Sequence, residues 1–183
     1  MLEGMKFLAA VALPLYALDQ ITKWWIFTHY ALEPTADNLQ RFPDVIEKTQ
    51  HLPMATEVIP EWFQIIHAAN TGAAFSMGTG KNTFFVVLSA VALVGLLIAW
   101  RKNVFTDEPS RWAVGLLIAG ILGNVTDRLV HGYVVDFLSF HLHFPGANPF
   151  PTFNVADTCI CTAAGLFIIA AIRDALRAKK AAK

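Results

Sequence analysis

The chain has 183 residues, a length that suits one domain, and we expect a single domain over residues 1–183. Its residues are 55% hydrophobic and only 15% charged, whereas soluble domains usually carry about 25% charged residues, so the composition excludes an ordinary soluble domain. Fourteen basic and fourteen acidic side chains cancel to a net charge of zero, which removes the general electrostatic argument for a nucleic-acid partner.

Long apolar segments predict that the chain crosses a membrane four times. The predicted spans cover about residues 7–27, 82–100, 112–130 and 154–174. Residues 82–100 carry no charge over 19 positions, close to the roughly 20 residues that a helix needs to cross the hydrocarbon core. The third and fourth spans reach this length only with their polar ends, and Asp19 and Lys23 interrupt the first. We therefore expect an all-α membrane protein with four transmembrane helices.

The basic residues predict the orientation of these spans. One side carries nine cations: Lys6, Arg101, Lys102, Arg111, Arg173, Arg177, Lys179, Lys180 and Lys183. The other side carries Arg41, Lys48 and Lys81. Because loops rich in lysine and arginine stay in the cytoplasm, both termini are expected to be cytoplasmic.

Two outward-facing segments connect the spans. Residues 28–81 begin with scattered prolines and charges, which predict an irregular loop with some surface structure. Residues 62–75 are richer in aromatic and β-branched residues, and the turn sequence NTG occupies 70–72, so we expect a small strand-containing platform on the outer membrane surface. Residues 131–152 contain no lysine or arginine, and prolines near their end prevent a continuous helix.

Ionisable groups near the membrane indicate where function lies, because each costs about 2.5 kcal/mol or more and normally faces the interior of a helical bundle. Asp19 and Lys23 are four residues apart, so they share one helical face and can neutralise each other. Asn124, Asp127 and Arg128 share a face of the third helix in the same way. All of these groups fall at the outward-facing ends of the spans, which indicates one shared pocket.

Asp136 and Asp157 are the candidate catalytic residues, because each is flanked by apolar residues and has no obvious partner next to it in sequence. Two carboxylates in an apolar setting cannot easily both ionise, so one keeps a proton. The ionised group can then activate a water that attacks a carbonyl carbon, while the protonated group donates to the carbonyl oxygen. Three amide side chains can orient the aspartates or the substrate: Asn70, Asn124 and Asn154.

Plainer interpretations stay open for the same residues. Asp127 and Arg128 alone would more often form a structural ion pair at the membrane edge. Asp19 and Lys23 alone would serve as a packing pair for the first helix. Asn154 is also a suitable cap for the fourth helix.

Other functional classes fit the sequence less well. A proton- or ion-coupled transporter would also bury carboxylates beside a cation, but such sites usually lie at the membrane midplane between repeated halves, and no repeat is visible. A non-enzymatic membrane scaffold would not need two aspartates in apolar surroundings. The HExxH signature is absent, and His141 with His143 lacks a third ligand for zinc. We therefore expect no metal and no cofactor.

Five blocks of the sequence, in order, resemble the lipoprotein signal peptidase family, also called signal peptidase II. They are DQITK at 19–23, NTGAAFS at 70–76, GILGNVTDR at 120–128, GYVVDF at 132–137 and FNVAD at 153–157. The resemblance extends to the four-span layout and thus covers most of the chain. Residues 30–60 look longer than expected for the family, and the sequence assigns them no role.

The resemblance implies an intramembrane aspartic endopeptidase of the bacterial inner membrane, with its active site near the outer leaflet. Such an enzyme would remove the signal peptide of a prolipoprotein by cleaving before a cysteine that carries a diacylglyceryl group. Asp136 and Asp157 would be the catalytic pair. The supporting or substrate-binding residues would be Asp19, Lys23, Asn70, Gly72, Asn124, Asp127, Arg128, Asn154 and Ala156. The lipid-modified substrate and membrane lipid would be the partners, the platform would hold the substrate at the membrane, and a monomer is expected.

Overall fold

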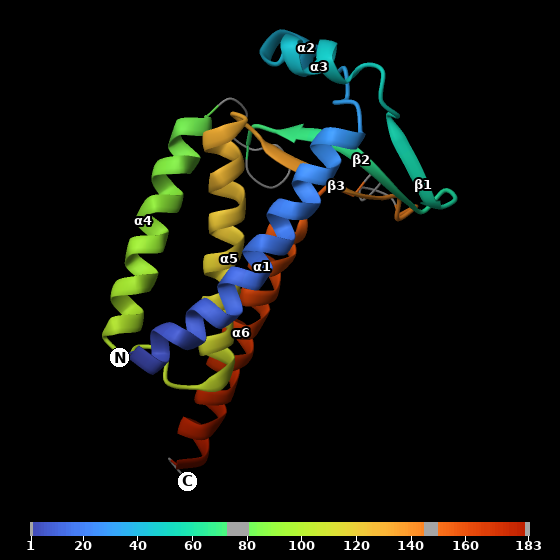
Figure 1. The fold of residues 1–183 in the computed structure, drawn as a ribbon. Coiled ribbons are helices and arrows are strands. Elements are labelled where there is room, and N and C mark those ends of the chain that lie inside the picture. The colour runs from blue at the N-terminus through green and yellow to red at the C-terminus, as the bar shows by residue number, and fades with distance from the viewer. Residues whose placement is uncertain (1, 73–80, 145–149, 182–183) are drawn as a thin grey trace. The chain divides into compact units, whose positions relative to one another are not determined.

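The computed structural model describes residues 2–72, 81–144 and 150–181 (Figure 1). The chain divides into two compact units. The first unit consists of Met1–Leu18, Val87–Asn124 and Val155–Lys183, and the second of Asp19–Val86 and Val125–Asn154. Each unit is therefore built from segments that lie far apart in the sequence.

Within the described residues, four helices are long and apolar enough to cross a membrane, which confirms the prediction of four transmembrane helices. They are α1 (Leu2–His29), α4 (Asn82–Arg101), α5 (Glu108–Val130) and α6 (Val155–Ala181). Helix α1 begins before the predicted apolar run and continues through Pro14, a residue that membrane helices tolerate. Helix α6 extends beyond its predicted end because its tail is rich in alanine, arginine and lysine, which favour helix.

The core of the first unit forms where α1 packs on α5. Leu8 and Ala12 of α1 belong to a buried cluster with Val114, Ile118 and Ala119 of α5. Small residues such as these alanines let membrane helices approach closely, and the packing itself then holds the helices together. Helix α4, by contrast, has no buried residue along its length, as expected for a helix whose apolar side chains contact lipid.

The second unit contains a three-stranded antiparallel sheet in the order β1-β2-β3 (Figure 1). The strands are β1 (Ala55–Ile59), β2 (Phe63–Asn70) and β3 (Val134–Phe140). Strand β2 confirms the prediction of a strand within 62–75, of which residues 73–75 lie outside the described part. Strand β3 is not predicted from the sequence. Most residues of β3 are buried on both faces, so its sequence lacks the alternation that identifies a strand with one exposed face.

Two short helices lie between α1 and β1, in the segment for which the sequence predicts mainly loop. They are α2 (Ala36–Arg41) and α3 (Pro43–Thr49). Thr35 caps the first of them with its side chain, and Pro43 opens the second. Phe42, between the two helices, packs its ring against Tyr133, with 4.6 Å between the ring centroids. These helices are therefore attached to the start of β3.

Candidate active site

Asp136 lies in the middle of β3, and only 2% of its surface is exposed. Its Oδ2 atom accepts a 3.0 Å hydrogen bond from Nδ2 of Asn70, and its Oδ1 atom accepts a 2.7 Å bond from Nδ2 of Asn154. A buried carboxylate is costly unless its oxygens are bonded, and here each oxygen has an amide donor. Asn70 ends β2 and Asn154 directly precedes α6, so two separate segments hold this carboxylate.

The turn after β2 fixes the orientation of the Asn70 amide. The backbone N–H of Gly72 donates to Oδ1 of Asn70 at 3.0 Å, which leaves Nδ2 to donate to Asp136. The carbonyl oxygen of Gly72 in turn accepts a 2.7 Å bond from Nη2 of Arg128. Arg128 therefore acts on Asp136 indirectly, by anchoring the turn that orients Asn70.

Two residues at the start of α4 hold Arg128 in place. The guanidinium group lies over the ring of Phe85, 5.1 Å from its centroid, in a cation–π contact. The backbone carbonyl of Arg128 accepts a 3.0 Å bond from Nδ2 of Asn82. Neither residue was predictable from the sequence, because an asparagine at the start of an apolar helix is expected to act as a cap and a phenylalanine there to contact lipid.

Lys23 of α1 lies between two carboxylates, and all three side chains are at most 3% exposed. Its Nζ atom is 2.9 Å from Oδ2 of Asp19 and 3.0 Å from Oδ2 of Asp127. Nε2 of Gln20 donates to both carboxylates, at 3.2 and 3.1 Å. The expected contact between Asp19 and Lys23 is therefore present. Asp127 pairs with Lys23 of another helix, whereas the sequence suggests its neighbour Arg128.

Asp127 connects this ion group to the strand that carries Asp136. Its Oδ2 atom accepts a 3.0 Å bond from the backbone N–H of Val135, the residue before Asp136. The sequence predicts a supporting or substrate-binding role for Asp19 and Lys23. Through Asp127, the same two residues also support the backbone of β3 beside the candidate catalytic carboxylate.

Asp157 belongs to the first unit and lies in the first turn of α6. Its Oδ1 atom accepts a 2.8 Å bond from Nδ2 of Asn124 on α5. The first helical turn favours a carboxylate, because the helix dipole places partial positive charge at this end. Gly120, one turn before Asn124, lets α5 approach α6, since a Cβ atom there would lie 2.5 Å from the carbonyl oxygen of Ala156. This close approach brings Asn124 within reach of Asp157.

The candidate residues thus form one group in each unit. The group in the second unit comprises Asp19, Lys23, Asn70, Gly72, Asp127, Arg128, Asp136 and Asn154. The group in the first unit comprises Asn124, Ala156 and Asp157. Sequence reasoning missed Gln20 and Gly120 as members. Gln20 carried a detectable signal, because a polar side chain inside a predicted span needs a partner.

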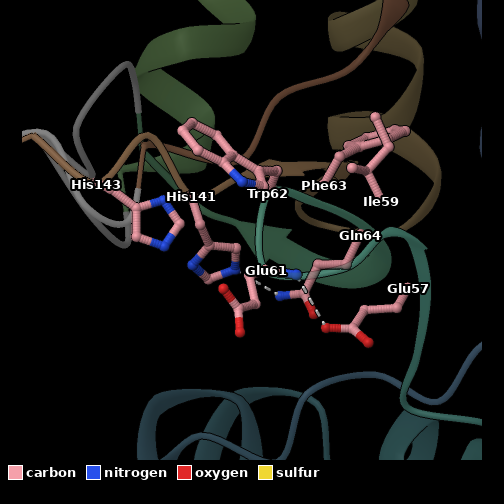
Figure 2. A pocket seen from close by; sticks show the side chains of 8 residues that line it. All are labelled: Glu57, Ile59, Glu61, Trp62, Phe63, Gln64, His141 and His143. Carbon is pink, nitrogen blue, oxygen red and sulfur yellow. Dashed lines mark hydrogen bonds between the residues drawn. The ribbon is translucent and has the colours of Figure 1, made fainter.

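His141 and His143 lie beyond the end of β3 and line a surface cavity of about 360 Å³ with residues of the β1–β2 hairpin (Figure 2). Nε2 of Gln64 donates to Nε2 of His141 at 3.1 Å. The ring of His143 packs on Trp62, with 4.7 Å between centroids. In the described ranges of the chain, no three His, Cys, Asp or Glu side chains are grouped so that they could hold a metal ion.

His131, directly after α5, borders the ion group of Lys23. Its ring stacks on Phe27, with 4.6 Å between centroids. Burial lowers the pKa of His131, while Asp127 raises it and Lys23 lowers it, and the net effect is a lowered pKa. The ring is therefore mostly neutral near pH 7 and adds no charge to the ion group.

Known proteins resemble this chain over nearly its whole length. The family model described as signal peptidase (SPase) II matches residues 11–173. The lipoprotein signal peptidase of Symbiobacterium thermophilum is 34% identical over 159 residues, which cover 87% of this chain and 90% of that protein. The lipoprotein signal peptidase of Syntrophotalea carbinolica is 32% identical over 181 residues, covering 96% and 97% respectively.

Solved structures also share the fold. A bacterial membrane enzyme determined by the in meso method at 1.9 Å resolution has a TM-score of 0.70 and 30% sequence identity. The match covers 91% of this chain and 93% of that one. Together with the four apolar helices, this similarity identifies a multi-pass membrane protein. Because the family model spans residues 11–173 and the relatives match over most of the chain, this protein belongs to the signal peptidase II family.

Proposed function

We propose that this protein is an aspartic endopeptidase that removes the signal peptide from prolipoproteins. The relatives are named lipoprotein signal peptidases, and membership in their family supports a peptidase. The observation that carries the proposal is the buried carboxylate of Asp136, which two asparagine amides hold at both oxygens. Asp157, the second carboxylate, follows Asn154 by three residues.

The bonding pattern supports joint action of the two aspartates. Asn154 donates to Asp136 and stands three residues before Asp157 in the chain. Asn124 donates to Asp157 and stands three residues before Asp127 in the chain. The carboxylate of Asp127 accepts a bond from the backbone N–H of Val135, the residue before Asp136. Asn154, which holds Asp136, is therefore close in sequence to Asp157. Asn124, which holds Asp157, is close in sequence to Asp127, which supports the strand that carries Asp136.

The proposed chemistry is hydrolysis by one ionised and one protonated carboxyl group. The ionised group takes a proton from a water molecule as the water oxygen attacks the carbonyl carbon of the scissile peptide bond. The protonated group gives its proton to the carbonyl oxygen, which avoids a full negative charge in an apolar site. When the tetrahedral intermediate collapses and its C–N bond breaks, the proton taken from water passes to the leaving nitrogen, and a hydroxyl of the intermediate returns its proton to the other carboxyl group. Asn70 and Asn154 keep the Asp136 carboxylate in position throughout.

The lipid environment supports the substrate class. Four apolar helices place the protein in a membrane, where a substrate whose cysteine carries a diacylglyceryl group would also be anchored. The distribution of basic residues favours cytoplasmic termini, and thus a site near the outer leaflet of the bacterial inner membrane. We further propose that the protein acts as a monomer. Family membership favours this activity over an ion-coupled transporter.

The test uses the full chain, purified in detergent, and one precursor in two forms. The form that carries diacylglyceryl on its cysteine should be cleaved immediately before that cysteine, as mass spectrometry of both products would show. The same precursor without lipid should be cleaved much more slowly. Equal or faster cleavage of the unlipidated form would contradict the substrate assignment, and an intact lipidated precursor would contradict the activity.

A further inference from the structure

The pairing register of strands β2 and β3 shifts by one residue in the middle of their ladder. Ile65 pairs with Leu138, and the next matched pair is Ala68 with Asp136. Over this interval β2 advances by three residues and β3 by two, which defines a β-bulge in β2. His67 lies within the bulge, directly before Ala68. Bulges of this kind redirect the side chains that follow them.

The bulge decides which face of β2 meets Asp136. Side chains alternate between the two faces of a sheet, so a shift of one residue moves every following side chain to the other face. A regular ladder continued from Ile65 would place His67 opposite Asp136 and turn Asn70 away. With the bulge, Ala68 lies opposite Asp136, and Asn70, two residues on, shares its face and donates the 3.0 Å bond.

The side chain of His67 ties the bulge to two other segments. The ring is fully buried, with Nδ1 3.2 Å from the carbonyl oxygen of Tyr30 and Nε2 3.2 Å from the hydroxyl of Tyr133. A carbonyl oxygen can only accept, so Nδ1 carries the proton and Nε2 accepts from Tyr133. Burial lowers the pKa of His67 to about 4, which keeps the ring neutral, as this bonding requires. The backbone carbonyl of His67 also accepts a 3.1 Å bond from the N–H of Glu33.

Tyr133 carries this restraint to β3. It directly precedes the first residue of β3, is fully buried, and packs against Phe42 between the two short helices. The histidine in the bulge and the tyrosine before β3 therefore connect the two strands. Along the ladder, the contact between Asn70 and Asp136 lies between these two residues. Residues 30–60, to which the sequence assigns no role, supply partners for both rings through Tyr30 and Phe42.

We propose that His67 and Tyr133 are positioning residues that fix the bulge in β2 and thereby keep Asn70 on the same face of the sheet as Asp136. The inference rests on the proposed function, because Asp136 is taken as a catalytic group. Neither side chain needs to contact the substrate. Loss of the bond between them should slow the chemical step and leave substrate binding unchanged, because the restraint acts through Asn70 on the carboxylate.

The test compares hydroxyl and ring variants in steady-state cleavage of the lipidated precursor, which gives kcat and KM separately. Tyr133→Phe removes only the hydroxyl that donates to His67, and His67→Phe removes both ring nitrogens while keeping an aromatic ring. The matched control is Tyr30→Phe, which removes a hydroxyl bonded to Thr56 at 2.9 Å but keeps the backbone carbonyl that His67 uses. A cooperative thermal unfolding transition shows that each variant is folded. If His67→Phe does not fold, Tyr133→Phe alone tests the inference.

We expect Tyr133→Phe to lower kcat by roughly tenfold, the equivalent of one hydrogen bond, with KM changed less than about twofold. Tyr30→Phe should keep the original kcat. In an Asn70→Ala background, Tyr133→Phe should cause no further loss, because the restraint then has no amide to position. A purely structural tyrosine would lower the rate by the same factor in both backgrounds.

Three results would overturn the inference: an unchanged kcat in folded Tyr133→Phe, a change confined to KM, or equal losses with and without Asn70. Asp136→Asn, measured in the same assay, separates this inference from the function on which it rests. If Asp136→Asn is inactive and Tyr133→Phe behaves like the original protein, only the positioning role fails. If Asp136→Asn stays active, the proposed catalytic role of Asp136 fails, and the positioning role fails with it.

Discussion

Replacing Gly120 by alanine should weaken catalysis by separating α5 from α6. A Cβ atom at this position would lie 2.5 Å from the carbonyl oxygen of Ala156 and 2.6 Å from Cγ1 of Ile160. Ordinary contacts of a Cβ atom begin at about 3.4 Å, so the two helices must move apart locally by roughly 1 Å. The bond from Asn124 to Asp157, one turn along, would then lengthen from 2.8 Å to roughly 3.8 Å, beyond hydrogen-bond range.

The size of the effect follows from this bond. A hydrogen bond to a charged group contributes about 1.5–3 kcal/mol, so kcat should fall by roughly 10- to 100-fold if the bond acts mainly during the reaction. Overpacking should also lower the free energy of unfolding by about 1–3 kcal/mol. Gly95 in α4 provides the matched control, because no atom of the described residues lies within 4 Å of a Cβ atom added there. Gly95→Ala should therefore cleave at the original rate.

The assay is the initial rate of cleavage of the lipidated precursor, with thermal unfolding followed on the same samples in detergent. Asn124→Ala should reproduce most of the rate loss of Gly120→Ala, since both remove the same bond to Asp157. Cleavage by Gly120→Ala as fast as by Gly95→Ala would show that the close approach of α5 to α6 is not needed for catalysis.

Two further predictions concern stability. Lys23→Met leaves Asp19 and Asp127 buried without their cation, so the free energy of unfolding should fall by about 3–5 kcal/mol, whereas exposed Lys48→Met should have little effect in thermal unfolding. The pKa of His67 is about 4 in the folded protein and 6.5 ordinarily, so its neutral ring stabilises the fold fully above pH 6.5. This contribution, up to about 3 kcal/mol, should disappear as the pH falls toward 4. The measurement is the midpoint of unfolding over a pH series. If the midpoint of His67→Phe declined with falling pH as much as that of the original protein, the prediction would be contradicted.

The features that the sequence predicted are those with a local signal. Apolar runs of about 20 residues locate membrane helices because every backbone polar group in lipid must be bonded within the segment. Asp19 and Lys23 were also predictable as a pair, since a helix places residues four apart on one face. The cost of ionisable groups in lipid pointed to Asp127, Asp136 and Arg128 as well.

The features that the sequence did not predict depend on pairing between distant segments. Strand β3 is buried on both faces, and nothing in its own sequence states that it pairs with β2. The bulge at His67 is defined only by the register of two strands, so a lone histidine among apolar residues gave no indication of it. Gly120 likewise looks like any small residue in a membrane helix until Ala156 is placed against it. These non-local contacts determine the geometry around both aspartates.

We propose that Asp136 and Asp157 act together in catalysis. Single-turnover cleavage of the lipidated precursor by Asp136→Asn, Asp157→Asn and the double variant tests it most directly, with exposed Asp174→Asn as the matched control. Each single variant should lose essentially all activity while staying folded, and the double variant should lose no more than either, because residues that act together do not contribute additively. Substantial cleavage by either single variant, or losses that multiply in the double variant, would contradict the account.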